Sequence, residues 1–333
     1  MILVTGGAGY VGSVLVQKLL DRGQQIRIFD RFYFGEKSIS SFSNKVDIVR
    51  GDVRSFPENV LGEVETIIYL AGLSNDPTAE FNPEANYQIN TEASVKIAKL
   101  AKEKGIKRFI FASSCSIYDF LNSKDSVKTE DDFVDPVLPY SLSKYKAENK
   151  LKELADDNFC VVILRKGTVF GYSPRMRFDL VVNTMVKDAF SKKTINVVDE
   201  GLHWRPLVDV ENAAEAYCVC VEANSDLVNR QVFNISLDNF QVKDIATTIQ
   251  TTLDKNFGVK TKIEFIKASG KIRSYRVSND KARKVLKFEA KMSIPQSVEK
   301  IASHIKNGDI SDFQNPIYYN IDWMKPIFER EGV

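Results

Sequence analysis

Short apolar runs alternate with longer segments of helical spacing through the first half of the chain. The runs have the length of buried strands, and the longer segments place apolar residues three and four positions apart, as amphipathic helices do. We expect strands at residues 1–5, 25–29, 46–49, 66–70, 109–112 and 161–164, and helices at residues 86–104 and 141–156. This alternation predicts an α/β protein with a doubly wound parallel sheet, in which ligands bind outside the carboxyl ends of the strands.

Three glycines follow the first apolar run at regular spacing. Gly6, Gly9 and Gly12 separate the expected strand from a helical segment that contains Tyr10 and Val11. In a dinucleotide-binding (Rossmann) fingerprint such glycines permit a tight turn, close approach of the backbone to a pyrophosphate, and packing of helix on strand. The phosphates then meet free N–H groups at the helix N-terminus. We therefore expect dinucleotide binding at this turn.

The second strand ends at Asp30, which lies 18 residues beyond Gly12. A carboxylate at this point accepts hydrogen bonds from the adenosine ribose hydroxyls and repels a 2′-phosphate. Asp30 therefore favours NAD over NADP. The neighbouring Arg31 leaves the alternative open, because a guanidinium there could accommodate the phosphate.

The second half of the chain is less regular. Residues 178–190, 212–222 and 242–253 have helical spacing, and residues 231–235 form another apolar run. No flexible linker is evident, which suggests two domains packed around a cleft. The predicted division is an NAD-binding domain of residues 1–166, to which 210–235 return, and a smaller α/β substrate-binding domain of residues 167–209 and 236–333.

Tyr140 and Lys144 open a predicted helix and share one face of it, because they are four positions apart. A tyrosine is a poor base near neutrality, but a nearby ammonium and the positive ring of an oxidised nicotinamide both favour its phenolate. The pair could then take a proton from an alcohol while hydride leaves the same carbon. Ser114, at the carboxyl end of the fifth strand, could bond the same substrate oxygen.

Composition excludes several other classes of protein. The 333 residues include 46 basic and 44 acidic ones, so the net charge of +2 gives no broad attraction to nucleic acid or membrane. No apolar run approaches the roughly 20 residues of a membrane span. The cysteines lack the spacing of zinc sites or disulfide frameworks, and there are two histidines, so no catalytic metal is expected. The chain opens on a core strand without a signal peptide, which indicates the cytoplasm.

Taken together, these motifs resemble those of the extended short-chain dehydrogenase/reductases, in the branch of nucleotide-sugar epimerases and dehydratases. The matching segments are residues 5–12, Asp30, 51–53, 70–72, Asn90, 111–118, 140–144 and 205–210. The resemblance implies a tightly held NAD, a nucleoside-diphosphate sugar as substrate, and a Ser–Tyr–Lys triad of Ser114, Tyr140 and Lys144. It also implies a homodimer in which the helices at 86–104 and 141–156 pack against their copies as a four-helix bundle.

The resemblance also assigns further residues. On the cofactor side it implies Gly6, Gly9, Tyr10, Val11, Gly12, Asp30, Asp52, Val53, Leu70, Ala71, Gly72, Asn90, Ser113, Tyr140 and Lys144, with Asp52 and Val53 by the adenine. On the substrate side it implies Ser114, Asn183, Arg205, Arg273 and Arg175. Arg205 matches the arginine that grips the diphosphate, for which a planar guanidinium is well suited. Arg175 and its neighbour Arg177 are equally explained as charges at a helix start.

Departures from the family pattern narrow the reaction. Dehydratases of this branch carry an Asp-Glu pair after the catalytic residue, whereas Cys115 and Ser116 stand here, and Cys115 reads as a buried packing residue. Asp30 argues against an NADPH-dependent reductase. The favoured reaction is oxidation at C4 of the sugar, as a 4-epimerase or a 4-dehydrogenase. A dinucleotide-sensing protein without catalysis is the alternative from another class.

Overall fold

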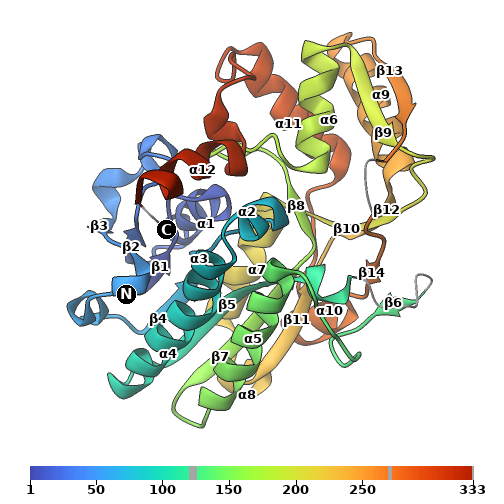
Figure 1. Cartoon of the computed structure of the whole chain (residues 1–333). Helices are drawn as coiled ribbons and strands as arrows, with labels where there is room; N and C mark the ends of the chain where they lie inside the picture. The colour runs from blue at the N-terminus through green and yellow to red at the C-terminus, as the bar shows by residue number, and fades with distance from the viewer. Residues whose placement is uncertain (120–125, 269–271, 332–333) are drawn as a thin grey trace.

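The computed structural model describes residues 1–119, 126–268 and 272–331, and its centre is a seven-stranded sheet (Figure 1). The strand order is β3-β2-β1-β4-β5-β7-β11, and neighbouring strands are parallel throughout. The strands are β1 (Ile2–Thr5), β2 (Ile26–Asp30), β3 (Asp47–Arg50), β4 (Thr66–Tyr69), β5 (Arg108–Ser114), β7 (Cys160–Lys166) and β11 (Gln231–Ile235). Each coincides with an apolar run of the sequence, so the prediction of a doubly wound α/β fold is confirmed.

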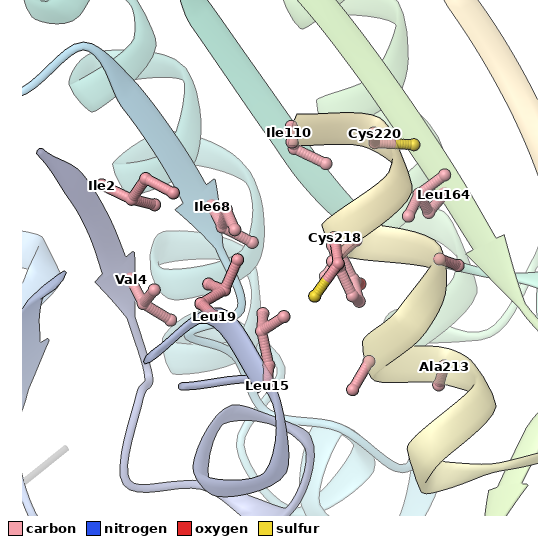
Figure 2. Close-up of a cluster of buried hydrophobic side chains, with 14 of the residues drawn as sticks. Ile2, Val4, Leu15, Leu19, Ile68, Ile110, Leu164, Ala213, Cys218 and Cys220 are labelled. Atoms are coloured by element: carbon pink, nitrogen blue, oxygen red, sulfur yellow. The ribbon is translucent and has the colours of Figure 1, made fainter. Parts of the chain in front are cut away.

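Helices cover both faces of this sheet. On one face, α1 (Tyr10–Asp21) and α7 (Val210–Glu222) pack against each other and bury their apolar sides on the strands. Figure 2 shows Leu15 and Leu19 of α1 in this core, near Val4 and Ile68 of the sheet. The opposite face carries α3 (Pro83–Tyr87), α4 (Ser94–Glu103) and α5 (Pro139–Leu154), whose side chains form a second core. The helix that bears Tyr140 and Lys144 is thus fixed directly on the sheet.

A smaller part of the molecule has its own core. Its helices are α6 (Val181–Ser191), α9 (Val242–Phe257) and α11 (Ile294–Lys306), which stand together at one end of the molecule in Figure 1. Its strands are β8 (Thr168–Phe170), β10 (Trp204–Asp209) and β12 (Asp238–Gln241), the pair β9 (Thr194–Val198) and β13 (Lys262–Ile266), and the pair β6 (Val127–Lys128) and β14 (Arg276–Val277). This part is the counterpart of the smaller domain expected from the sequence.

Two helices of the carboxyl-terminal range depart from the predicted division. α10 (Asp280–Leu286) lies beside β11 and buries Leu286 in the same core as α1 and α7. α12 (Asn320–Glu331) lies beside α2 (Asp76–Phe81) and buries Met324 and Phe328 in the core of the opposite face. The range 236–333 is therefore not confined to the smaller part, because these apolar side chains find their burial on the large sheet. The remaining α-helix of the described chain is α8 (Ser225–Val228). Over the described residues, no helix has both the length and the apolarity needed to cross a membrane.

The single helix expected over residues 86–104 is interrupted. A π-helical segment, Gln88–Ala93, separates α3 from α4. Within it, the Asn90 amide donates to the Leu73 carbonyl (3.1 Å), and the Thr91 hydroxyl donates to the Ser143 carbonyl (2.7 Å). These bonds tie the segment to the loop after β4 and to α5. Such π-helical turns are frequent at functional sites, and this one packs against α5, the helix that carries Tyr140 and Lys144.

Candidate active site

A cavity of about 370 Å³ lies at the carboxyl edge of the large sheet, and its wall includes residues of both parts. Concave sites at this edge are where open α/β sheets bind their ligands. Residues predicted for the cofactor or for catalysis that line the cavity are Gly6, Gly9, Tyr10, Val11, Gly12, Asp30, Asp52, Val53, Leu70, Ala71, Gly72, Ser113, Ser114, Tyr140 and Lys144. The predicted substrate residues Arg175 and Arg273 line it as well. Segments far apart in sequence thus converge on one space.

The glycine turn leaves no room for side chains at its two ends. Gly6 has a positive φ of 75°, and a Cβ there would lie 2.7 Å from the Ala71 nitrogen. A Cβ at Gly12 would lie 2.2 Å from the Gly6 carbonyl oxygen. The turn delivers the chain to Tyr10, where α1 begins without a side-chain cap from Gly9. The N–H groups of the first helical turn are therefore available to an anion.

Asp30 stands beside this turn at the end of β2. Its carboxylate accepts hydrogen bonds from the backbone N–H groups of Ala8 (2.9 Å) and Phe32 (2.7 Å). The neighbouring Arg31 pairs with Asp52 and, at 2.6 Å, with Glu331 of α12. Two carboxylates therefore already hold the guanidinium that could have received a 2′-phosphate. The arrangement fits a ribose without that phosphate.

The three predicted catalytic residues meet at the same edge. Tyr140 lies in the first turn of α5 after Pro139, Lys144 follows one turn later, and Ser114 is the last residue of β5. The Ser114 side chain lies close enough to the Tyr140 phenol to favour its ionised form. The Lys144 ammonium lies 5.0 Å from the ring centre of Phe111, and a Cβ at Gly72 would come within 3.2 Å of it. Ser114, Tyr140 and Lys144 are thus gathered around one side of the cavity.

The pKa of the Tyr140 phenol differs from the sequence-based expectation, in which Lys144 lowers it. Burial raises the pKa of Tyr140 to about 12, although the Ser114 side chain and the charges of Arg177 and Arg273 oppose this rise. Burial also lowers the pKa of Lys144 to about 7, so burial disfavours the ammonium form of this side chain. The charges that lower the pKa of the phenol are those of the two arginines.

Three predicted residues do not line the cavity. Asn90 is fully buried in the π-helical segment and accepts a hydrogen bond from the Leu73 N–H (3.1 Å). Asn183 is fully buried and accepts from the Gly171 N–H at 2.9 Å. Arg205 donates to the carbonyl oxygen of Arg273 and to that of Trp204 (2.9 Å). In the structure these side chains hold neighbouring backbone segments, and their contacts with ligands stay predictions.

The two cavity arginines of the predicted substrate set differ in their partners. Arg273 forms ion pairs with Asp76 and, at 2.7 Å, with Asp119. Arg175 has no ion pair in the described part of the chain and donates to the Asn320 side chain at 2.6 Å. Its neighbour Arg177 is paired with Asp179 at 2.8 Å. Of these guanidiniums, Arg175 is the one without a carboxylate.

Several cavity residues were absent from the sequence-based set. Lys166 is the clearest, because it ends β7 and is the register partner of Ser114. The rule that found Ser114, a polar residue at the carboxyl end of a buried strand, also applies to Lys166. Ser116, Asp76 and Asn320 line the cavity too, and their positions in loops and short helices gave no comparable signal. Within the described chain, no group of three or more His, Cys, Asp or Glu could hold a metal ion.

A buried ion pair joins the helix that carries Tyr140 and Lys144 to the strands of the large sheet. Glu148, one turn after Lys144, accepts three hydrogen bonds from Arg165 of β7, at 3.0, 3.1 and 2.6 Å, and one from the Ser113 hydroxyl of β5. Glu148 is 0% exposed and Arg165 is 3% exposed. The pair ties α5 to the two strands that carry Ser114 and Lys166. Cys115 lies in the adjacent core, as expected, and its thiol donates to the Arg165 carbonyl at 3.1 Å.

Comparison with known families gives this site a context. The model of the NAD dependent epimerase/dehydratase family matches residues 2–236, which is more than half of the chain. The chain belongs to this family. The resemblance inferred from the glycine turn and the Tyr–Lys pair is thereby confirmed. NAD is the cofactor of the family, and the glycine turn, Asp30 and the paired Arg31 fit it.

Individual family members are similar over most of the chain. UDP-glucuronic acid decarboxylase 1 of Arabidopsis thaliana is 28% identical, over 92% of this chain and 70% of its own. This chain spans about two thirds of such plant relatives. The UDP-glucuronic acid 4-epimerase of Bacillus cereus, solved with UDP-glucuronic acid and NAD, is 22% identical with a TM-score of 0.79, covering 92% of this chain and 99% of that one. The UDP-glucose 4-epimerase of Thermotoga maritima is 20% identical with a TM-score of 0.81, covering 93% and 99%. These structures share the two-part epimerase fold.

Proposed function

We propose that this member of the epimerase/dehydratase family catalyses NAD-dependent oxidation at C4 of a nucleoside-diphosphate sugar, with Tyr140 as the general base. The observation that carries the proposal is the convergence of Ser114, Tyr140 and Lys144 on the cavity that the glycine turn also lines. A dinucleotide sensor would need the turn and Asp30, but not a phenol, an amine and a strand-end serine gathered in the same cavity wall.

The side chains divide the work of removing a hydroxyl proton. The Ser114 hydroxyl and the Tyr140 phenol both line the cavity, so a sugar hydroxyl bound between them would be oriented by one and deprotonated by the other. When bound, NAD would accept the hydride that leaves C4, and the Tyr140 phenolate would be favoured by the positive nicotinamide ring.

The fate of the 4-keto sugar decides the net reaction. Return of hydride to the opposite face gives a 4-epimer, whereas release of the ketone makes the protein a 4-dehydrogenase. A dehydratase needs an acid beside the triad. Cys115 is fully buried with its pKa raised by burial, and Ser116 has no acidic group, so neither residue supplies one. We therefore favour epimerisation or net oxidation over dehydration.

The smaller part is proposed to hold the nucleoside diphosphate. Arg273 lines the cavity and lies near enough to Tyr140 to lower its pKa. Arg205 bonds the Arg273 backbone, so we propose that it acts on the diphosphate together with that loop. Asn183 holds Gly171 in the segment between β8 and α6, and we propose that this segment faces the same diphosphate.

The proposal is tested by a screen of UDP- and dTDP-sugars with the native protein, followed by Tyr140→Phe. The screen monitors NADH, 4-keto products, epimers and released CO2, which separates dehydrogenase, epimerase and decarboxylase outcomes. Positioned proton transfer typically contributes ~10²–10⁴-fold in rate, so turnover should fall by at least about 100-fold while NAD remains bound.

Tyr145→Phe is the matched control, because Tyr145 lies on the same helix and is absent from the cavity wall. It should retain near-native turnover. Near-native turnover of Tyr140→Phe on any sugar that the native protein oxidises would contradict the mechanism.

A further inference from the structure

The Arg175 guanidinium is buried and forms no ion pair with a carboxylate among the described residues, although the charge of Asp179, which is paired with Arg177, is near enough to raise the pKa of Arg175. The residue is 6% exposed, and one side-chain nitrogen, Nη2, donates to the Asn320 Oδ1 at 2.6 Å. The other, Nη1, is buried and has no hydrogen-bond partner among the described residues. An unpaired buried charge is strongly unfavourable unless a ligand completes its surroundings. Since Arg175 lines the cavity, the missing partner is an anion that binds there.

The segment that carries Arg175 is packed on the phosphate-binding end of α1. The Ser173 hydroxyl donates to the Tyr10 carbonyl at 2.7 Å and lies 3.1 Å from the Ser13 hydroxyl. The Arg175 N–H in turn donates to the Ser173 Oγ at 3.3 Å. Arg175 is thus held next to the first turn of α1, although 165 positions separate it from Tyr10.

The guanidinium also contacts the turn that follows Asp30. Its carbon lies 3.6 Å from the centre of the Phe34 ring, which fixes the plane of the guanidinium by stacking. Phe34 and Tyr10 both line the cavity on the side of the glycine turn. Arg177, which also lies 5.8 Å from the centre of the Tyr10 ring, and Arg273 are the arginines whose charges act on Tyr140.

We propose that Arg175 binds the diphosphate of NAD, opposite the N-terminus of α1, and does not bind the sugar nucleotide. The proposal reassigns a residue that the sequence placed on the substrate side, and it does not depend on the reaction proposed above. Two oxygens of a diphosphate suit a planar guanidinium, and the free N–H groups of α1 supply the opposite half of the site. Burial and the Arg177 charge lower the pKa of Arg175 to about 9, an effect that a bound phosphate reverses.

The test measures binding without turnover. Native protein, Arg175→Met and Arg175→Lys are freed of cofactor, and calorimetry gives the dissociation constants of NAD, ADP-ribose and adenosine. A charge-assisted hydrogen bond accounts for roughly 10- to 100-fold in affinity. Arg175→Met should therefore weaken NAD and ADP-ribose by about that factor and leave adenosine unchanged. Arg175→Lys keeps the charge, so it should recover part of the loss and serves if the methionine variant does not fold.

A second arm distinguishes the two sources of diphosphate. UDP is titrated into each protein saturated with NAD, and its affinity should be the same in all three. Unchanged NAD affinity in both variants, or an equal loss for adenosine and ADP-ribose, would overturn the assignment. Weaker UDP binding with unchanged NAD binding would instead place Arg175 on the sugar nucleotide.

Discussion

Tyr140 shows how strongly the cavity controls a single side chain. With its pKa at about 12, mainly because of burial, the phenol is neutral near pH 7 in the protein alone. Ser114, Arg177 and Arg273 act in the direction of the phenolate but do not overcome the desolvation. A further positive charge close to the ring is required, and oxidised NAD carries one. If Tyr140 is the general base, as proposed, its phenolate would be populated mainly when oxidised NAD is bound.

Lys166 places a second ammonium site near Lys144. It donates to the Ser113 carbonyl at 3.0 Å and to the Tyr217 hydroxyl at 2.8 Å. Burial lowers its pKa to about 7. Burial is the largest cause of the lowered pKa of Lys144, and the charge of Lys166 is the second largest. The protonation of one lysine is thus coupled to that of the other.

Replacement of Lys166 by Met should raise the pKa of Lys144, because it removes the neighbouring like charge. If protonated Lys144 supports turnover, native activity should fall as the pH rises through about 7. In Lys166→Met this fall should shift to higher pH, as measured by the pH profile of kcat. Lys187→Met is the control, since Lys187 lies on α6 and is paired with Asp188 at 3.0 Å. An unshifted profile in Lys166→Met would refute the coupling.

At the scale of elements, the Glu148–Arg165 pair joins α5 to β7 in a fully buried setting. Removal of one partner of such a pair leaves an uncompensated charge and typically costs about 3–5 kcal/mol. We expect Glu148→Gln to lower the free energy of unfolding by an amount of this order, measured by urea denaturation. Glu153→Gln on the exposed side of α5 should change it by less than about 0.5 kcal/mol. Similar values for the two variants would show that the pair does not stabilise α5.

The elements of the large sheet were predictable because each depends on a local pattern. Apolar runs mark the strands, and Gly6, Asp30 and Ser114 mark their carboxyl ends. The interruption at Gln88–Ala93 was not predictable, because it depends on hydrogen bonds to Leu73 and Ser143 from elsewhere in the chain.

The contacts of Asn183 were also not predictable from local patterns. Its side-chain oxygen accepts a hydrogen bond from the Gly171 N–H, which lies in a loop outside the predicted helix. Local patterns thus locate the walls of the cavity, and long-range packing decides which side chains reach it.

At the scale of the molecule, the two ends of the described chain meet at one cavity. Gly6 and Tyr10 line it near the start, and Asn320 and Met324 line it near the end. The Trp323 indole donates to the Tyr33 carbonyl at 2.7 Å, which holds α12 against the turn after β2. The sequence-based division places residues 236–333 in the smaller part, with neither a helix at 320–331 nor the surface that covers it predicted. This explains why its placement with the smaller part did not match the structure.

Self-association is the remaining expectation at this scale. We predict a homodimer in which α4 and α5 pack against their copies. Lys99 and Lys150 lie on the exposed sides of these helices and would be covered in the dimer. Sedimentation at micromolar concentration should give twice the chain mass of 37.6 kDa. A monomer under these conditions would refute the prediction.

The location of the interface can be tested separately, because all four native cysteines are buried and an introduced surface thiol is the preferred target of an alkylating reagent. Lys150→Cys should react slowly in the dimer and faster on dilution below the dissociation constant. Lys260→Cys is the matched control, since the Lys260 side chain is 82% exposed and lies outside both helices. It should react at the same rate at every concentration. A thiol that is covered by a partner subunit reacts only in the dissociated fraction. If the protein is a dimer and both thiols react at the same rate at every concentration, the interface lies elsewhere than α5.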